Sequence, residues 1–111
     1  MSSENNFNLR NFIDSKEAEE LSRCFRIQDY LKNLSSTEKD KLFNIWNLYI
    51  RPAIEKGKTF VIVRDSIFVD IVGIHKKFLT DEFGYDIQSI FEIDNFIGYK
   101  IVWSNKYETP N

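Results

Sequence analysis

The most constraining feature of this sequence is the alternation of apolar and polar residues from Tyr85 to Ser104. Apolar residues recur at every second position, which is the period of a strand with one buried face. Between the two alternating stretches, residues 94–98 include Asn and Gly, which tolerate the positive φ angles of a short loop. We therefore predict a β-hairpin whose loop is formed by these residues. The side chains expected on its inward face are Ile87, Ser89, Phe91, Ile93, Tyr99, Ile101 and Trp103.

A loop over residues 94–98 also fixes the register of the predicted hairpin. It places Ile93 opposite Tyr99, so that two apolar side chains meet across the strands. It also places Glu92 opposite Lys100, so that opposite charges face each other. A slip by one residue would turn the aromatic side chains toward water, which makes this register a strong requirement of the pattern.

The composition predicts one soluble domain. The chain has 111 residues, of which 42% are hydrophobic and 15% aromatic, and its net charge is −2. This length supports a core without disulfide staples, and the single cysteine is typical of a reducing compartment. No apolar run approaches the ~20 residues of a membrane span, and the N-terminus is polar rather than a signal peptide. We expect a cytoplasmic protein, and its richness in Asn, Lys, Ile and Phe is typical of a virus or a low-GC bacterium.

The domain is predicted over residues 14–104, between flexible tails at residues 1–13 and 105–111. Asp14 or Ser15 is expected to cap the first helix, which should run to about Lys32. Its apolar stripe follows the three-or-four spacing of an amphipathic helix. The residues of this stripe are Ala18, Leu21, Cys24, Phe25, Gln28 and Leu31.

A second helix is expected to begin at Ser35, which forms a capping-box pattern with Glu38. Pro52 should kink or end this helix near Ile50, because proline lacks a backbone N–H and its ring clashes with the preceding turn. Gly57 then stops the remnant. The short link between the first two helices predicts an antiparallel helical hairpin.

The middle of the chain carries a strand and a segment that has two interpretations. Residues 59–63 form a short apolar run rich in β-branched residues, which predicts a strand buried on both faces and central in the sheet. Residues 66–83 match a helical stripe that ends at Gly84. An alternative remains, in which residues 67–72 pair back on the first strand as a hairpin.

The predicted order of elements is helix, helix, strand, helix, strand, strand. This order indicates an α+β fold, in which an N-terminal helical hairpin and a third helix pack on a small, mainly antiparallel three-stranded sheet that ends in a β-hairpin.

The residues that could carry chemistry are sparse. His75 is the only histidine and lies on an apolar stripe, where a general base would need a carboxylate within hydrogen-bond reach. Cys24 lies near two arginines but is expected to be a buried small hydrophobe. We predict no catalytic residue, no metal site and no cofactor, and hence no enzyme. A solvated surface is the interpretation of the carboxylates at Asp65, Asp70, Asp81, Glu82 and Asp86.

A protein-binding surface is the leading functional hypothesis. Phe96 and Ile97 lie in the predicted turn, where exposure is expected. Phe43 and Leu48 lie on the flank of the second helix and exceed what one buried face can hold. Because exposed apolar patches mark partner surfaces, we predict a regulator or inhibitor of a larger complex, or a homodimer.

Nucleic-acid binding is the alternative hypothesis. A basic helix beside a hairpin is similar to the way in which winged-helix proteins hold DNA. A winged helix places its second and third helices in succession, whereas the predicted order here puts a strand between them. The basic residues that would contact nucleic acid are Arg51, Lys56, Lys58, Arg64, Lys76 and Lys77.

Overall fold

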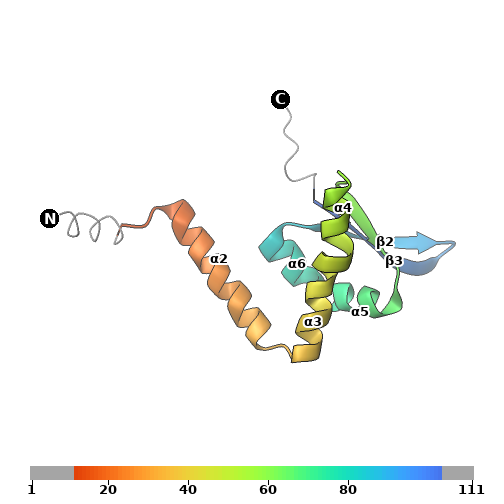
Figure 1. Cartoon of the computed structure of the whole chain (residues 1–111), viewed down its shortest axis with the longest axis horizontal. Coiled ribbons are helices and arrows are strands. Elements are labelled where there is room, and N and C mark those ends of the chain that lie inside the picture. Colours follow the sequence, from red (N-terminus) through yellow and green to blue (C-terminus); the bar gives the residue numbers. More distant parts are fainter. Residues whose placement is uncertain (1–11, 104–111) are drawn as a thin grey trace. The chain divides into compact units, whose positions relative to one another are not determined.

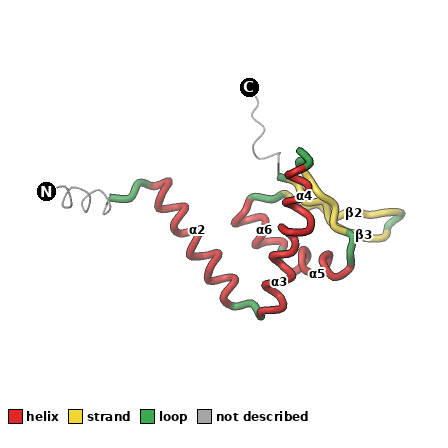
Figure 2. Tube along the Cα trace, viewed as in Figure 1, coloured by secondary structure: helices red, strands yellow, loops and turns green. Residues whose placement is uncertain are grey.

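The computed structural model describes residues 12–103, which form helices and one antiparallel sheet (Figures 1 and 2). The chain divides into two units, Met1–Asn33 and Leu34–Asn111. The α+β class is confirmed. The prediction of one domain over residues 14–104 stays a prediction.

The predicted tails lie almost wholly outside the described residues. Of residues 1–13 and 105–111, the structure describes only Phe12 and Ile13, which precede the first helix. None of the helices between residues 12 and 103 is both long and apolar enough to cross a bilayer.

The described part of the first unit is the helix α2, Ser15–Lys32. Asp14 caps it as predicted, because its carboxylate accepts a hydrogen bond of 2.8 Å from the backbone N–H of Glu17. No residue of α2 is buried, and the side chains of Leu21 and Phe25 are exposed. The prediction that Cys24 is buried was wrong, since its side chain is exposed.

The second unit begins with a long helical segment of changing geometry. The helix α3, Ser36–Asn44, continues into the π-helix η1, Ile45–Ile50, and then into α4, Arg51–Glu55. The expected kink or end near Ile50 is instead a widened turn, in which the N–H of Arg51 bonds to the carbonyl of Trp46. This wider turn accommodates Pro52, whose ring would clash with the carbonyl four residues earlier in a regular α-helix.

Gly57 ends this helical segment as predicted, with a φ angle of 76°. The N–H of Gly57 bonds to the carbonyl of Ile54, and the N–H of Lys58 bonds to the carbonyl of Ala53. These two bonds form a Schellman motif, which requires a left-handed residue at the position of Gly57.

The sheet has the strand order β1-β3-β2, and all its pairs are antiparallel. The strand β1, Phe60–Val63, is therefore an edge strand, and the prediction that it is central was wrong. Its outward face is uncovered, so that Phe60 and Ile62 are exposed while Val63 is fully buried. The central strand is β3, Asn95–Val102, because it pairs with both neighbours.

Residues 66–83 are helical, which confirms the main prediction and excludes the strand alternative. They form two helices, α5 Ser66–Ile74 and α6 Lys76–Phe83, separated at His75. Asp65 caps α5 by accepting from the N–H of Ile67 at 2.9 Å. Gly84 ends α6 in the left-handed conformation, as predicted.

The strand β2, Asp86–Glu92, pairs with β3 and confirms the predicted hairpin, but not its register. The turn contains only Ile93 and Asp94, so that Ser89 lies opposite Tyr99. The partners predicted for Tyr99 and Lys100 were therefore wrong by four positions: Gln88, not Glu92, lies opposite Lys100.

The core lies where the helical segment and α5 meet the inner half of the sheet. Its fully buried side chains come from both the helices and the sheet. The largest of them are Leu42, Ile45, Ile50, Leu79, Ile101, His75, Val63 and Val72.

Candidate functional site

The clearest unpartnered surface of the second unit lies at the end of the hairpin. Phe91, Ile93 and Phe96, which we call the tip cluster, are 62%, 90% and 43% exposed. Figure 1 shows the hairpin projecting beyond the helices of this unit. The prediction that Phe91 and Ile93 are sheltered was wrong, because the hairpin extends past the helices that would cover them.

The tip cluster continues an aromatic series that begins at the covered part of the sheet. The ring of Phe91 lies 5.9 Å from that of Phe96, which in turn lies 5.0 Å from that of Tyr99. The hydroxyl of Tyr99 would lie 3.0 Å from a Cβ atom at Gly73 in α5. The face that packs on α5 thus runs outward into the tip cluster.

The turn itself is conformationally costly. Ile93 and Asp94 have φ angles of 49° and 67°, which is the left-handed region. Two-residue turns of this kind favour Asn-Gly, and a β-branched residue in this region costs about 1–2 kcal/mol. Ile93 is therefore unfavourable for the backbone conformation of the turn, and its side chain buries little area.

The hairpin carries negative charge around these apolar residues. Between residues 85 and 99 there is no Lys or Arg, and the ionisable acids are Asp86, Glu92 and Asp94. Asp86 accepts a hydrogen bond of 2.8 Å from the amide of Gln88, which leaves its charge unneutralised. Glu92 and Asp94, which are the neighbours of Ile93 in the chain, therefore give the tip cluster an acidic rim.

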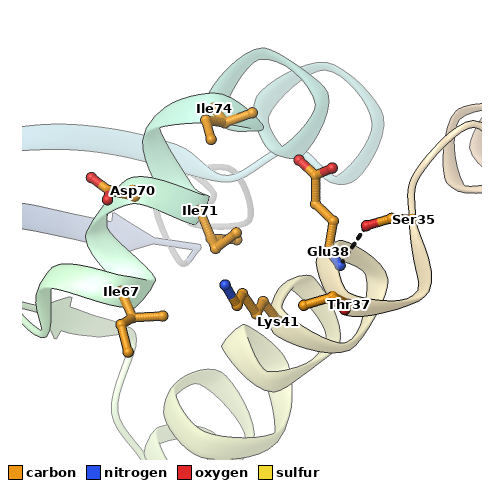
Figure 3. Close-up of a pocket in the computed structure, with 8 residues that line it drawn as sticks. All are labelled: Ser35, Thr37, Glu38, Lys41, Ile67, Asp70, Ile71 and Ile74. Atoms are coloured by element: carbon orange, nitrogen blue, oxygen red, sulfur yellow. Dashed lines mark hydrogen bonds between the residues drawn. The ribbon is translucent and has the colours of Figure 1, made fainter.

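A groove of about 410 Å³ lies between the first turns of α3 and one face of α5 (Figure 3). The amine of Lys41 points into it, the carboxylate of Glu38 turns toward the end near Ile74, and Asp70 points away. Its polar groups carry both signs of charge above an apolar floor, so that no single ligand chemistry is favoured. The lining residues are Ser35, Thr37, Glu38, Lys41, Ile67, Asp70, Ile71 and Ile74.

His75 lies behind this groove and is only 1% exposed. Its Nε2 atom lies 3.0 Å from the carboxylate of Glu38, a partner that is remote in sequence. A carboxylate within hydrogen-bond reach of His75 is therefore present. The pair links α3 to the junction of α5 and α6.

The four residues predicted to bind a partner do not form one surface. Phe96 belongs to the tip cluster, whereas Phe43 is exposed on α3 and Leu48 is exposed on η1. Ile97 is half-buried and is the residue of β3 that has no partner in β2, since Gly98 pairs with Ile90. Their roles in partner binding stay predictions.

Sequence reasoning missed Phe91 and Ile93 because it placed the turn too late. A signal for the correct turn was present, since a two-residue turn at Ile93 and Asp94 pairs the aromatic residues Phe91 and Phe96.

The predicted basic residues also fall into separate groups. Arg51 begins α4, and Lys56 and Lys58 line a hollow of about 180 Å³ with Leu48. Arg64 follows the other end of β1, at residues 60–63. These positions do not converge on one stripe.

The remaining two basic residues, Lys76 and Lys77, begin α6. The amine of Lys76 lies 6.0 Å from the centre of the Tyr99 ring. Lys77 donates a hydrogen bond of 2.7 Å to Asp81, and this bond with the charge of Asp81 raises the pKa of Lys77. Asp81 thus offsets part of the positive charge of α6.

Metal-ligand side chains do not gather in the described part of the chain. Within residues 12–103, no group of three His, Cys, Asp or Glu side chains is placed to hold a metal ion.

The chain matches no protein-family profile, no curated protein and no solved structure.

Proposed function

We propose that this chain is a non-enzymatic protein-binding module that docks on a larger complex through the tip cluster. The proposal rests on the exposure and conformation of Ile93, a β-branched residue that is 90% exposed in a left-handed turn. Folding gains little from this residue, and its backbone conformation is unfavourable. A role in recognition accounts for both costs.

The composition of the tip cluster supports the same proposal. Phe91 and Phe96 present two aromatic rings that pack edge to face and are therefore already ordered before binding. Aromatic side chains are favoured as interface anchors, and ordering them in advance lowers the entropy cost of association. The partner needs an apolar pocket that accepts the tip of a hairpin.

The acidic rim indicates the electrostatics of that pocket. Glu92 and Asp94 flank Ile93 on both sides and would be repelled by an anionic membrane surface. The same charges favour a protein pocket with basic residues at its rim. By occupying such a pocket, the chain would regulate or inhibit the complex without transforming a substrate.

The test is affinity capture from native extract with three forms of the full chain. We expect the wild type and the control Ile54→Ser, which alters an exposed apolar residue of α4, to retain the same protein. The double variant Phe91→Ser, Phe96→Ser should lose it while remaining folded by circular dichroism. Retention of the same protein by the folded double variant would contradict the proposal.

Nucleic-acid binding is the second candidate, and one observation favours it. The helices α5 and α6 follow each other directly along the chain. The strand β1 precedes both helices, and the hairpin follows them. The succession of two helices that a winged helix requires is therefore present, contrary to the predicted order. In this candidate, Lys76 and Lys77 at the start of α6 would contact phosphates.

This candidate predicts binding that weakens steeply with salt, because each phosphate contact releases a counterion. The variant Lys76→Glu, Lys77→Glu should weaken retardation of duplex DNA, whereas Lys32→Glu on α2 should not. The absence of any retardation of DNA or RNA by the wild type at low salt would remove this candidate.

A further inference from the structure

The strand β2 forms one edge of the sheet. In the sheet order β1-β3-β2, the strand β2 pairs with β3 on one side, and no strand between residues 12 and 103 pairs with its other side. An edge of this kind presents backbone N–H and C=O groups that an added strand can pair with.

The charges on β2 select the kind of strand that fits. Proteins commonly guard an edge with Lys or Pro, and β2 contains neither. It instead carries Asp86 at its first position and Glu92 at its last, and no cation lies between residues 85 and 99. An incoming strand therefore meets an acidic edge.

The two faces of β2 differ in a regular way. The irregularity of the ladder falls on β3 at Ile97, so that β2 keeps its strict alternation. Ile87 and Phe91 lie on the face that packs on α5, whereas Asp86 and Glu92 lie on the opposite face. A complementary strand needs apolar side chains on the first face and cations on the second.

A second copy of this chain does not meet that need. Full-length antiparallel pairing of two β2 strands would place Asp86 of each copy opposite Glu92 of the other. Parallel pairing would place each acid opposite its own copy. Like charges directly opposite one another are destabilising, so both arrangements are disfavoured.

We propose that the β2 edge binds an extended segment of a partner protein, in which Lys or Arg alternates with apolar residues, as a fourth strand of the sheet. This inference rests on the proposed function, because the same hairpin would carry both the tip cluster and the added strand. It deepens that function by naming the chemistry of the partner segment.

The test is titration of the ¹⁵N-labelled full chain with a nine-residue peptide of alternating lysine and valine. We expect binding that slows hydrogen exchange of the β2 amides pointing away from β3. A peptide with glutamate in place of lysine should bind at least tenfold more weakly. The lysine peptide N-methylated at alternate residues should also bind at least tenfold more weakly, because it keeps its charge but loses backbone N–H donors.

Charge reversal supplies the matched variant. The form with Asp86→Lys and Glu92→Lys should prefer the glutamate peptide and reject the lysine peptide. Three results would overturn the inference: no binding of the lysine peptide by the wild type, protection confined to amides outside β2, or unchanged preference in the reversed variant.

These outcomes differ from failure of the proposed function. If the lysine peptide pairs with β2 but capture does not depend on the tip cluster, only the proposed function fails. If capture depends on the tip cluster but the peptide does not pair with β2, only the edge inference fails.

Discussion

The carboxylate of Glu38 lies 3.0 Å from Nε2 of His75, although 37 positions separate the two residues. The capping-box pattern predicts that the side chain of Glu38 accepts a hydrogen bond from the backbone N–H of Ser35, at the start of its own helix. Ser35 forms its half of that motif by accepting from the N–H of Glu38 at 3.1 Å. The Glu38 side chain instead reaches the buried histidine and ties α3 to α5 and α6.

This link predicts a stability effect of Glu38→Ala. Because the substitution removes a hydrogen bond from a buried imidazole, the free energy of unfolding should fall by about 1–3 kcal/mol. The control Glu55→Ala, on the exposed surface of α4, should change it by less than about 0.5 kcal/mol. Urea unfolding followed by circular dichroism measures both, and equal effects would contradict a structural role for the pair.

Gly98 predicts a steric effect. A Cβ atom at this position would lie 2.3 Å from the carbonyl oxygen of Val63 and 3.3 Å from Cα of Arg64. Since backbone atoms cannot yield as a flexible side chain can, Gly98→Ala should destabilise the protein by about 3 kcal/mol. Gly57→Ala meets no atom within 4 Å and has only its left-handed φ to oppose it, so it should cost about 1 kcal/mol. The urea concentration at the midpoint of unfolding should be lower for Gly98→Ala than for Gly57→Ala. A lower midpoint for Gly57→Ala would show that β1 and β3 separate readily.

The turn of the hairpin predicts opposite effects on stability and binding. The variant Ile93→Asn, Asp94→Gly restores a favoured turn sequence and removes little buried area, so it should gain about 1 kcal/mol. The melting temperature should rise by roughly 4–8 °C. Capture of the partner should weaken because the variant lacks the exposed isoleucine. A fall in melting temperature would instead show that Ile93 stabilises the fold.

The ionisation of Tyr49 should make the stability of the protein depend on pH in the alkaline range. Burial, and then the charge of Asp65, raise the pKa of Tyr49 above that of a free tyrosine. The folded state therefore disfavours the tyrosinate, while the unfolded chain ionises at about pH 10. This contribution to stability is fully present below about pH 10 and is lost as the pH rises through the folded pKa. The loss of stability above pH 10 should be smaller in Tyr49→Phe than in the wild type, as measured by urea unfolding at several pH values. An identical loss in both proteins would contradict this assignment.

The helix boundaries were predictable because their causes are local. Asp14, Ser35 and Asp65 each accept a hydrogen bond from a backbone N–H two or three residues ahead. Gly57 and Gly84 adopt left-handed angles that few other residues tolerate. Such interactions depend only on neighbouring residues, so they can be predicted directly from the sequence.

The break at His75 was not predictable in the same way. Gly73 lies two residues before it, but both sides of the break follow one helical stripe, so the pattern favours a continuous helix. The imidazole is held by Glu38 from another helix, so the interaction involves residues that only folding brings together.

Alternation with period two is a property of one strand, so the hairpin near residues 85–104 was predictable from the sequence alone. Its register, the edge position of β1 and the exposure of Phe91 and Ile93 depend instead on how the elements pack together. Alternation specifies which residues share a face, but not how far the helices extend over that face. The tip cluster is exposed because the hairpin is longer than its cover, and that difference in length exists only in three dimensions.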